Sequence, residues 1–468
     1  FNWRRMLAVS VTTLTIISTF LWAFAFLSIY QKPVTRVAAS DWIYENIPAA
    51  INLHIEGADG QKITQPVAYQ NTAVISAETP YTYHFTIDQP AQLSVVEVEN
   101  VLSQSSDTGL VSILATVYKI NGEARTISGA GFLQSEFRGT SDSRGDLASI
   151  ILDQPALLET GAQYLLELSV AESDVFLRIG GGVSLKLDQE ELLLPSPVYK
   201  LTQNSPFQVN FVPRATGEFS ALTLHRVVDL AGTNEDSVLT ALLMDPNDPQ
   251  QILASGEIIA NFKPQDDPRG ESAPIQLDKP VNLDDTHMYT LVLTVGGKAE
   301  LGIYNSVTVL ESTWDDALPV GLHGFNQFGY WDGIYGNNLN LELYWDDNQA
   351  KLDRLETMLN RGDAIFMSSN RQWGTIPRVP ERYPLTTEFY RALIGCTENE
   401  DILKCFAIAE PGRYQGELGY ELTAVFQNDP AIGNLRINDQ RAEEPFTVYD
   451  HPTVLIFTKT ADYDPARV

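Results

Sequence analysis

Cysteine is almost absent from this sequence, and histidine is scarce. Among 468 residues there are 2 cysteines and 6 histidines. Cys396 and Cys405 have eight residues between them, a spacing that differs from CxxC, and no cluster of histidines accompanies them. A zinc site is therefore not expected. Outside the cytoplasm, we expect the two cysteines to form a disulfide that closes a small loop.

Basic residues are also few. The chain has 31 Lys and Arg against 60 Asp and Glu, which gives a net charge of −29. This balance excludes nucleic acid as a partner, because a polyphosphate needs concentrated positive charge. The acidity favours a solvated, repulsive surface. The alternative is bound Ca²⁺, for which the oxygen ligands would come from Asp142, Asp146, Asp266 and Asp267. Solvated loops are the favoured reading of these residues, and no other cofactor is predicted.

Several catalytic signatures are missing as well. The sequence has no HExxH, no P-loop and no GxGxxG. It also has no GxSxG nucleophile elbow. No catalytic residue is predicted from such motifs.

One long hydrophobic run stands near the N-terminus. The run from Met6 to Ile29 contains 24 residues without a charged side chain, which as a helix exceeds the roughly 30 Å of a bilayer's hydrocarbon core. We therefore expect one transmembrane helix in residues 1–32, with the bulk of the chain extracytoplasmic and lipid as a partner. A cleaved signal peptide, with Ala23-Phe-Ala25 as its cleavage pattern, is the rival interpretation. The first residue, Phe1, is also compatible with a piece of a longer polypeptide.

An internal repeat occupies the middle of the chain. The segment from Ser112 aligns with the segment from Ser237, Arg144-Gly145 with Arg269-Gly270, and Tyr164 with Tyr289, each at an offset of 125 residues. A repeat of this length is a whole domain. Short alternating runs separated by Gly, Pro, Asn and Asp indicate strands. We expect two tandem jelly-roll-like β-sandwiches, at residues 51–190 and 191–306.

Helix and strand signals alternate in the last part of the chain. Residues 346–360 and 386–394 show helical patterns, and residues 364–368, 420–426, 446–449 and 454–457 resemble strands, the last two as a closing hairpin. Residues 307–468 are therefore expected to form a small α/β domain. A short helix at 40–48, within a first segment at 33–50, is expected to belong to it. The predicted fold is mainly β with α/β, with both sandwiches inserted into the α/β domain.

Both ends of the chain carry a resemblance. The segments PVTRVAASDWIYENIP (33–48), STWDDALP (312–319), AIFMSSNRQWGTIPRVPERYPLTTEFYRALI (364–394), LGYELTAVF (418–426) and EEPFTVYDHPTVLIF (443–457) form one pattern. The pattern resembles the C-terminal part of bacterial polytopic proteins of the dolichyl-phosphate-mannose mannosyltransferase-like class and the related YYY-type membrane proteins. The resemblance implies a last transmembrane helix leading into a small extracytoplasmic α/β domain.

The sequence departs from that pattern in two ways. About 260 residues stand between the two halves of the α/β domain, and the multi-span region with its catalytic acid has no counterpart. The resemblance therefore implies an accessory domain rather than a chain that transfers sugar alone.

Three groups of residues are candidates for ligand binding. Trp314, Asp315 and Asp316 follow a strand, where they would bind a sugar or a cation or, in the favoured alternative, form a helix cap or turn. Arg371, Arg378 and Arg382 would grip a phosphate or carboxylate, or pair with the two aspartates; these two interpretations remain equal. Asp450 and His451 suggest a general base, but a turn that caps the hairpin is favoured.

The expected function follows from the resemblance. It is the membrane-anchored extracytoplasmic portion of a glycosyltransferase-like envelope protein, acting in recognition or assembly rather than catalysis by itself. One alternative is a non-catalytic structural subunit of an envelope complex that uses the sandwiches for protein contacts. A second alternative is a glycan-binding module. The expected partners are other membrane subunits or helices, and a glycan or lipid-linked sugar.

Overall fold

The computed structural model describes residues 3–104, 109–122, 124–140, 142, 144–188, 191–233, 235–265, 267–312, 318–321, 334–335 and 339–467. The chain forms two compact units. The β unit comprises Pro48–Asn305 together with Ile334 and Tyr335, and the α/β unit comprises the N-terminal helices and the chain from Ser306 onward. The fold is thus mainly β, with a small α/β region assembled from both ends of the sequence.

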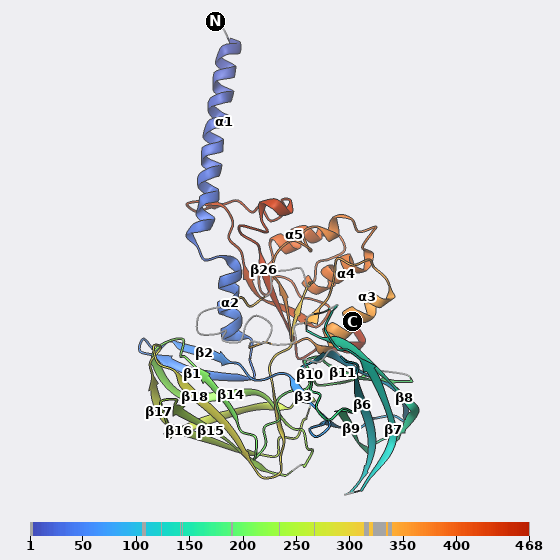
Figure 1. Ribbon diagram of the computed structural model, residues 1–468. Coiled ribbons are helices and arrows are strands. Elements are labelled where there is room, and N and C mark those ends of the chain that lie inside the picture. The colour runs from blue at the N-terminus through green and yellow to red at the C-terminus, as the bar shows by residue number, and fades with distance from the viewer. Residues whose placement is uncertain are drawn as a thin grey trace. The chain divides into compact units, whose positions relative to one another are not determined.

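The β unit contains two large, curled antiparallel sheets (Figure 1). The main path of the first sheet runs through β12 (Glu191–Leu194), β11 (Val183–Leu187), β5 (Ala91–Ser103), β8 (Asp146–Leu158), β7 (Ala124–Ser135), β6 (Val111–Asn121), β9 (Gln163–Val170) and β4 (Tyr81–Phe85). The second path runs through β2 (Lys62–Val67), β1 (Ile51–Gly57), β14 (Gly217–Asp229), β17 (Glu271–Leu283), β16 (Asp248–Ala260), β15 (Ser237–Asp245), β18 (Tyr289–Gly296) and β13 (Phe207–Phe211). Three short strands complete the sheets: β3 (Ala73–Ile75), β10 (Leu177–Ile179) and β19 (Leu301–Tyr304). The two paths have the same order, position for position.

The repeat seen in the sequence is reproduced in structural detail. The Tyr164 hydroxyl accepts a hydrogen bond from the Glu159 N–H at 2.7 Å, and the Tyr289 hydroxyl accepts one from the Asp284 N–H at 3.1 Å. The two acceptors, Tyr164 and Tyr289, are 125 residues apart, and so are the two donors, Glu159 and Asp284. The two tyrosines therefore fix the same turn in each copy.

One glycine in each sheet allows two strands to approach closely. A Cβ on Gly131 would lie 2.3 Å from the Ile151 carbonyl oxygen, and one on Gly256 would lie 2.4 Å from the Gln276 carbonyl oxygen. No side chain fits such an approach between two backbones. At Gly131, β7 makes its single ladder pair with β8, to Leu152.

The edge hairpins of the two sheets come from unexpected places in the chain. β11 and β12 follow the first copy and extend its sheet beside β5, whereas β1 and β2 precede the first copy and extend the second sheet beside β14. Leu53 of β1 is opposite Leu222 of β14. In the first copy, Val96 of β5 takes the place that Leu222 has in the second copy, and it is opposite Leu185 of β11. The segment expected as one sandwich, 51–190, therefore contributes strands to both sheets.

The α/β unit has a five-stranded mixed sheet in the order β21 (Leu339–Asn340), β20 (Thr308–Leu310), β22 (Ala364–Met367), β26 (Val454–Lys459) and β23 (Tyr420–Phe426). β20 is parallel to both of its neighbours, and β26 is antiparallel to both of its neighbours. The helices are α2 (Thr35–Asn46), α3 (Gln349–Arg361), α4 (Pro384–Ile394) and α5 (Ile402–Ala407). In Figure 1, α2 lies on one side of this sheet and α3, α4 and α5 lie on the other.

The alternation along the central strands explains this layering. Ile365 and Met367 belong to the core formed with α3, α4 and α5. Phe366 points to the opposite face and is also buried, where α2 contacts β23 and β26. Strands that are buried on both faces read as continuous apolar runs, which is the pattern of residues 364–367.

Two local expectations were wrong. The helix expected at 40–48 begins earlier, at Thr35, and ends at Asn46. Ser40 is not its N-cap but an interior residue, whose hydroxyl donates to the Arg36 carbonyl oxygen. The hairpin expected between 446–449 and 454–457 does not form. Residues 444–446 are a 3-10 helix, η3 (Glu444–Phe446), followed by a turn, and β26 pairs instead with β22 and β23.

The N-terminal helix α1 (Trp3–Leu27) stands clear of the rest of the α/β unit (Figure 1). Within the described ranges, one helix is long and apolar enough to cross a membrane. Its side chains are exposed from Trp3 to Phe24, whereas Ala25 is buried. A short 3-10 helix, η1 (Ser28–Gln31), connects α1 to α2.

Candidate functional site

The carboxyl ends of two parallel strands bring polar residues to one edge of the α/β sheet. Glu311 and Ser312 follow β20, and Ser368, Ser369 and Asn370 follow β22; all five are buried. The Gln372 side chain donates to the Ser312 hydroxyl at 2.8 Å and joins the two strand ends. In open α/β sheets, ligand sites form at such an edge.

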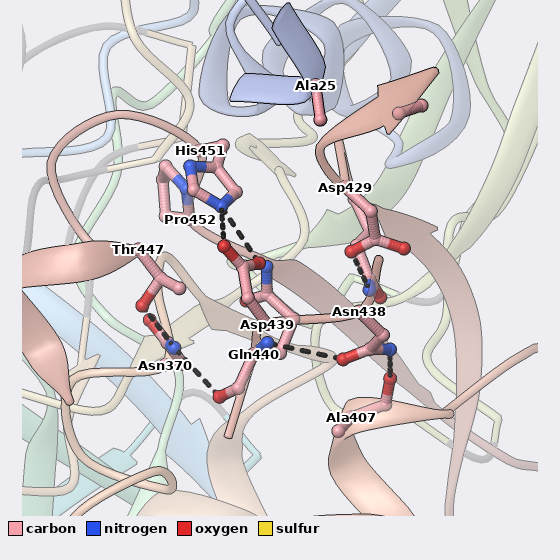
Figure 2. Close-up of polar contacts among 12 residues, drawn as sticks. Ala25, Asn370, Ala407, Asp429, Asn438, Asp439, Gln440, Thr447, His451 and Pro452 are labelled. Atoms are coloured by element: carbon pink, nitrogen blue, oxygen red, sulfur yellow. Dashed lines mark hydrogen bonds and ion pairs between the residues drawn. The ribbon is translucent and has the colours of Figure 1, made fainter. Parts of the chain in front are cut away.

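Asn370 is the centre of a buried network (Figure 2). Its Nδ2 donates to the Thr447 hydroxyl at 2.6 Å and to the Gln440 carbonyl oxygen at 3.2 Å. The Asn370 Oδ1 and the Gln440 side-chain amide are buried and have no hydrogen-bond partner among the residues that the structure describes. Buried polar groups normally find partners. This network is thus able to accept a further polar group.

His451 and Asp439 form a second polar pair nearby. The His451 Nε2 lies 3.0 and 3.2 Å from the two carboxylate oxygens of Asp439 (Figure 2). The charge of Asp439 also acts on a second carboxyl, that of Asp429. Burial raises the pKa of Asp429, and the negative charge of Asp439 raises it further. An imidazole held by a carboxylate is the arrangement of a general base.

The surroundings of His451 limit what it can do chemically. The residue is 1% exposed, and the Phe26 ring of α1 lies edge-on to the imidazole with centroids 5.7 Å apart. Its Nδ1 is buried and lacks a hydrogen-bond partner within the described part of the chain. The imidazole is thus closed to solvent, and a substrate hydroxyl has no open path to either nitrogen. The geometry therefore favours a structural role for the pair at the base of α1.

Asp450 contacts η1, the short helix that follows α1. Its carboxylate accepts a hydrogen bond from the Tyr30 hydroxyl at 2.7 Å. In the structure Asp450 thus links the 444–452 segment to η1, and the hairpin that it was expected to cap is absent.

The three candidate arginines are engaged with other parts of the α/β unit. Arg371 pairs with Glu444 at 3.0 Å. Arg378 donates to the carbonyl oxygens of Gly374 and Arg441, at 2.7 and 2.8 Å. Arg371 and Arg378 thus both contact the 441–449 segment.

Arg382 belongs to a different neighbourhood. It lies 3.6 Å from Asp346 and stacks near the Tyr383 ring. Trp314, Asp315 and Asp316 lie outside the described residues, so their predicted roles stay predictions.

The candidate calcium loops contain carboxylate–arginine pairs. Asp142 accepts from Arg144 at 2.6 Å, and its counterpart in the repeat, Asp267, accepts from Arg269 at 2.7 Å. Asp146 accepts the Gly139 N–H at 2.8 Å, and Asp266 lies outside the described residues. At Asp142 and Asp267, guanidinium groups occupy carboxylate oxygens that a cation would need, which counts against the Ca²⁺ interpretation of these two residues.

Cys396 and Cys405 form a disulfide between the end of α4 and α5, with their Cα atoms 6.1 Å apart. The Glu400 carboxylate lies close to both sulfurs. Because the sulfurs are bonded to each other, they are not available as thiolate ligands for a metal.

Sequence reasoning missed the residues that are most deeply engaged. Asn370 and Thr447 lie within the segments 364–394 and 443–457 that carry the resemblance, but they are not among the predicted site residues, and neither are Asp439 and Gln440. Lys351 was missed as well. It is buried, and its ammonium donates to Thr386, to the Asp347 carboxylate and to two backbone carbonyls. The lysine at the start of a helix, with Asp347 four residues earlier, was the available signal.

Comparison with known proteins identifies no family. No family model matches the chain, and no curated protein matches it. Among solved structures, dimeric latent PorU from Porphyromonas gingivalis has 11% identity and a TM-score of 0.15 over 57% of this chain. The match spans 23% of the PorU chain. The T=1 nodavirus of Penaeus vannamei has 8% identity and a TM-score of 0.12, over 55% of this chain and 98% of its own. Similarity at this level carries no argument about fold or function.

Proposed function

We propose that α1 anchors this protein in a membrane and that the chain beyond it is the extracytoplasmic portion of a glycosyltransferase-like envelope protein. In this proposal the chain acts in recognition or assembly rather than catalysis by itself. The observation that carries the proposal is the contrast along α1. Its apolar side chains are exposed from Trp3 to Phe24, yet Ala25, near its C-terminal end, is buried in the α/β unit.

The segments that follow α1, namely η1 and α2, are joined to the rest of the α/β unit by several hydrogen bonds. The Ser28 hydroxyl accepts the Ala431 N–H at 2.9 Å, and the Thr35 hydroxyl donates to the Pro452 carbonyl oxygen at 2.6 Å. Arg36 donates to the carbonyl oxygen of Ser368, at the end of β22. An exposed apolar helix is stable in lipid and unfavourable in water. These contacts fix the α/β unit close to the C-terminal end of that helix.

The anchor is tested by the form of the protein in membranes. The full chain, expressed in bacterial cells, is expected to resist extraction with alkaline carbonate and to retain residues 1–25 by intact mass. A soluble protein that begins at Phe26 would identify a signal peptide and would contradict the proposal.

The outer face of the first sheet supports a role in assembly. Phe132 of β7 and Leu147, Ile151 and Leu157 of β8 are exposed apolar residues. The repeat places Glu257, Ser272, Gln276 and Asn282 at the corresponding positions of the second copy, all exposed. At these four positions the shared fold carries apolar residues in the first copy and polar residues in the second, so folding alone does not require the apolar residues there. The second copy also exposes Ile259 on β16. The partner is expected to be another membrane subunit that offers an apolar surface.

This role is tested by giving the first copy the residues of the second. Phe132→Glu with Ile151→Gln is expected to leave the thermal unfolding temperature nearly unchanged. The same variant should shift the protein, solubilised from membranes in mild detergent, from a larger complex to the size of the isolated chain. Ile252→Gln, which changes an exposed isoleucine of the second copy, is the matched control. Equal complex sizes for the unmodified chain, the double variant and Ile252→Gln would refute the assembly role of this face.

The glycosyltransferase connection is tested in cells. Loss of the gene is expected to change the envelope glycans, and the variant that lacks the complex should show the same change. If glycans are unaltered while a complex is lost, the chain is a structural subunit of the envelope instead.

A further inference from the structure

The length of α1 fixes the level at which the chain leaves the bilayer. This argument rests on the proposed anchoring of α1. Arg4 and Arg5 mark one end of the apolar helix. About 20 residues at 1.5 Å each cross the roughly 30 Å of hydrocarbon. Counted from Met6, the opposite boundary lies near Phe26.

Two segments of the α/β unit lie beside α1 at this level. The first is the hairpin formed by β24 (Ala431–Ile432) and β25 (Leu435–Arg436), whose strand β24 contacts both α1 and η1. The second is the turn that contains Asp450, hydrogen-bonded to Tyr30, and His451, packed on Phe26. In the view of Figure 2, Ala25 of α1 lies above His451 and Asp429.

Large apolar and aromatic side chains on these segments are exposed. Exposure is 66% for Leu435, 69% for Tyr449, 59% for Tyr30 and 38% for Ile432. Ile432 and Leu435 are paired across the hairpin. Tyrosine is enriched where membrane meets water, because its ring is apolar and its hydroxyl is polar. Leucine and isoleucine gain free energy when they leave water.

We propose that Tyr30, Ile432, Leu435 and Tyr449 form a collar around the base of α1 that inserts into the headgroup region of the bilayer. The collar gives the α/β unit a second contact with the lipid besides the helix. Two contacts at different points resist rotation about the helix, so the α/β sheet is held at a defined angle to the membrane. Apolar partition drives this contact, because a chain with net charge −29 is repelled by anionic lipid.

The depth of the collar can be measured with spin labels. Cys396 and Cys405 are joined in a disulfide. When labelling is done without reductant, a newly introduced cysteine is therefore labelled selectively. Leu435→Cys and Tyr449→Cys are made in the full chain, which is reconstituted in phosphatidylcholine vesicles. Both labels are expected to be more accessible to oxygen, which concentrates in lipid, than to a water-soluble nickel chelate. Accessibility should be unchanged at about 1 M salt, where the Debye length falls to about 3 Å.

Two controls separate this inference from the anchoring of α1. Ile259→Cys, on an equally exposed residue of the second sheet, should report water. Val11→Cys, in the apolar part of α1, should report hydrocarbon. If the Val11 label is in lipid while the labels at 435 and 449 match the one at 259, the collar is refuted and the anchor stands. If the Val11 label is in water, the anchor itself is refuted.

Discussion

At the scale of single residues, the two copies of the repeat provide matched positions for measuring the same interaction twice. Tyr164 and Tyr289 each accept a backbone N–H from five residues upstream. Tyr164 is fully buried and Tyr289 nearly so. Removing either hydroxyl leaves that amide, which belongs to an exposed residue, without its protein acceptor.

Tyr164→Phe and Tyr289→Phe are each expected to reduce the free energy of unfolding by about 0.5–1.5 kcal/mol, the usual net contribution of one hydrogen bond. The loss should be larger at Tyr164, where the hydrogen bond is shorter and burial is complete. Urea denaturation followed by circular dichroism measures the change. Tyr449→Phe, at an exposed position, should be neutral, and losses no larger than that of this control would contradict the argument.

Asp267 gives a prediction for acid stability. Burial raises the pKa of this carboxyl, but the hydrogen bond from Arg269 and the charges of Arg269 and Arg226 outweigh burial and hold the pKa below its ordinary value. A carboxyl with a lowered folded pKa contributes stability that is present above its unfolded pKa, about 3.9, and lost as pH falls through the folded pKa. Asp267→Asn is therefore expected to destabilise the protein at neutral pH and to weaken the loss of stability below about pH 4.

The measurement is urea denaturation across this pH range, compared with Asp174→Asn, which changes an exposed aspartate. An unaltered pH profile for Asp267→Asn would show that the ion pair does not contribute to acid unfolding.

At the scale of secondary-structure elements, a disulfide and an aromatic stack connect neighbouring segments of the α/β unit. The disulfide joins the end of α4 to α5, and Trp373 and Phe406 stack beside it with ring centroids 5.1 Å apart. The cross-link spans 9 residues. A loop of this size restricts the unfolded chain only moderately.

Cys396→Ala together with Cys405→Ala is expected to cost about 2–3 kcal/mol, from the loop-closure entropy of a short cross-link. The effect should be confined to the α/β unit, because that unit and the β unit have separate cores. Hydrogen exchange measured by mass spectrometry reports each unit separately. Equal loss of protection in β5–β9 would contradict independent units.

At the scale of the whole molecule, chain order and spatial order differ within the β unit. Ile51, Leu53 and Ile55 precede the first copy, yet they belong to the core of the second sheet together with Phe219 and Leu222. The second sheet therefore cannot be completed by residues that follow it in sequence. Its edge strand comes from the other end of the unit, so the two copies are expected to depend on one another.

Leu53→Asp and Leu185→Asp test this arrangement at equivalent registers. Each places a charge in a buried position, which is strongly destabilising. Leu53→Asp is expected to remove hydrogen-exchange protection from β13–β18, although residue 53 precedes the first copy. Leu185→Asp should affect β4–β9 first. Loss of protection in the first sheet alone for Leu53→Asp would overturn the pairing of β1 with β14.

The sequence by itself determined the features that depend on local pattern. The apolar run gave the long helix, the 125-residue offset gave two sheets of identical strand order, and the apolar segments 364–367 and 420–426 gave strands of the α/β sheet. Residue alternation and helix length act along the chain, so they can be read without knowing the neighbours.

Tertiary structure alone decided which partners these elements take. The hairpin of β1 and β2 has no repeat partner at a fixed offset, and its place beside β14 is set by the unpaired backbone groups at that sheet edge. Residues 446–449 turn instead of extending, because Thr447 and Asp450 are used to contact Asn370 and Tyr30. The ion pairs of Arg371 and Arg382 join residues far apart in sequence. Such contacts depend on which surfaces meet after folding, and no spacing along the chain specifies them.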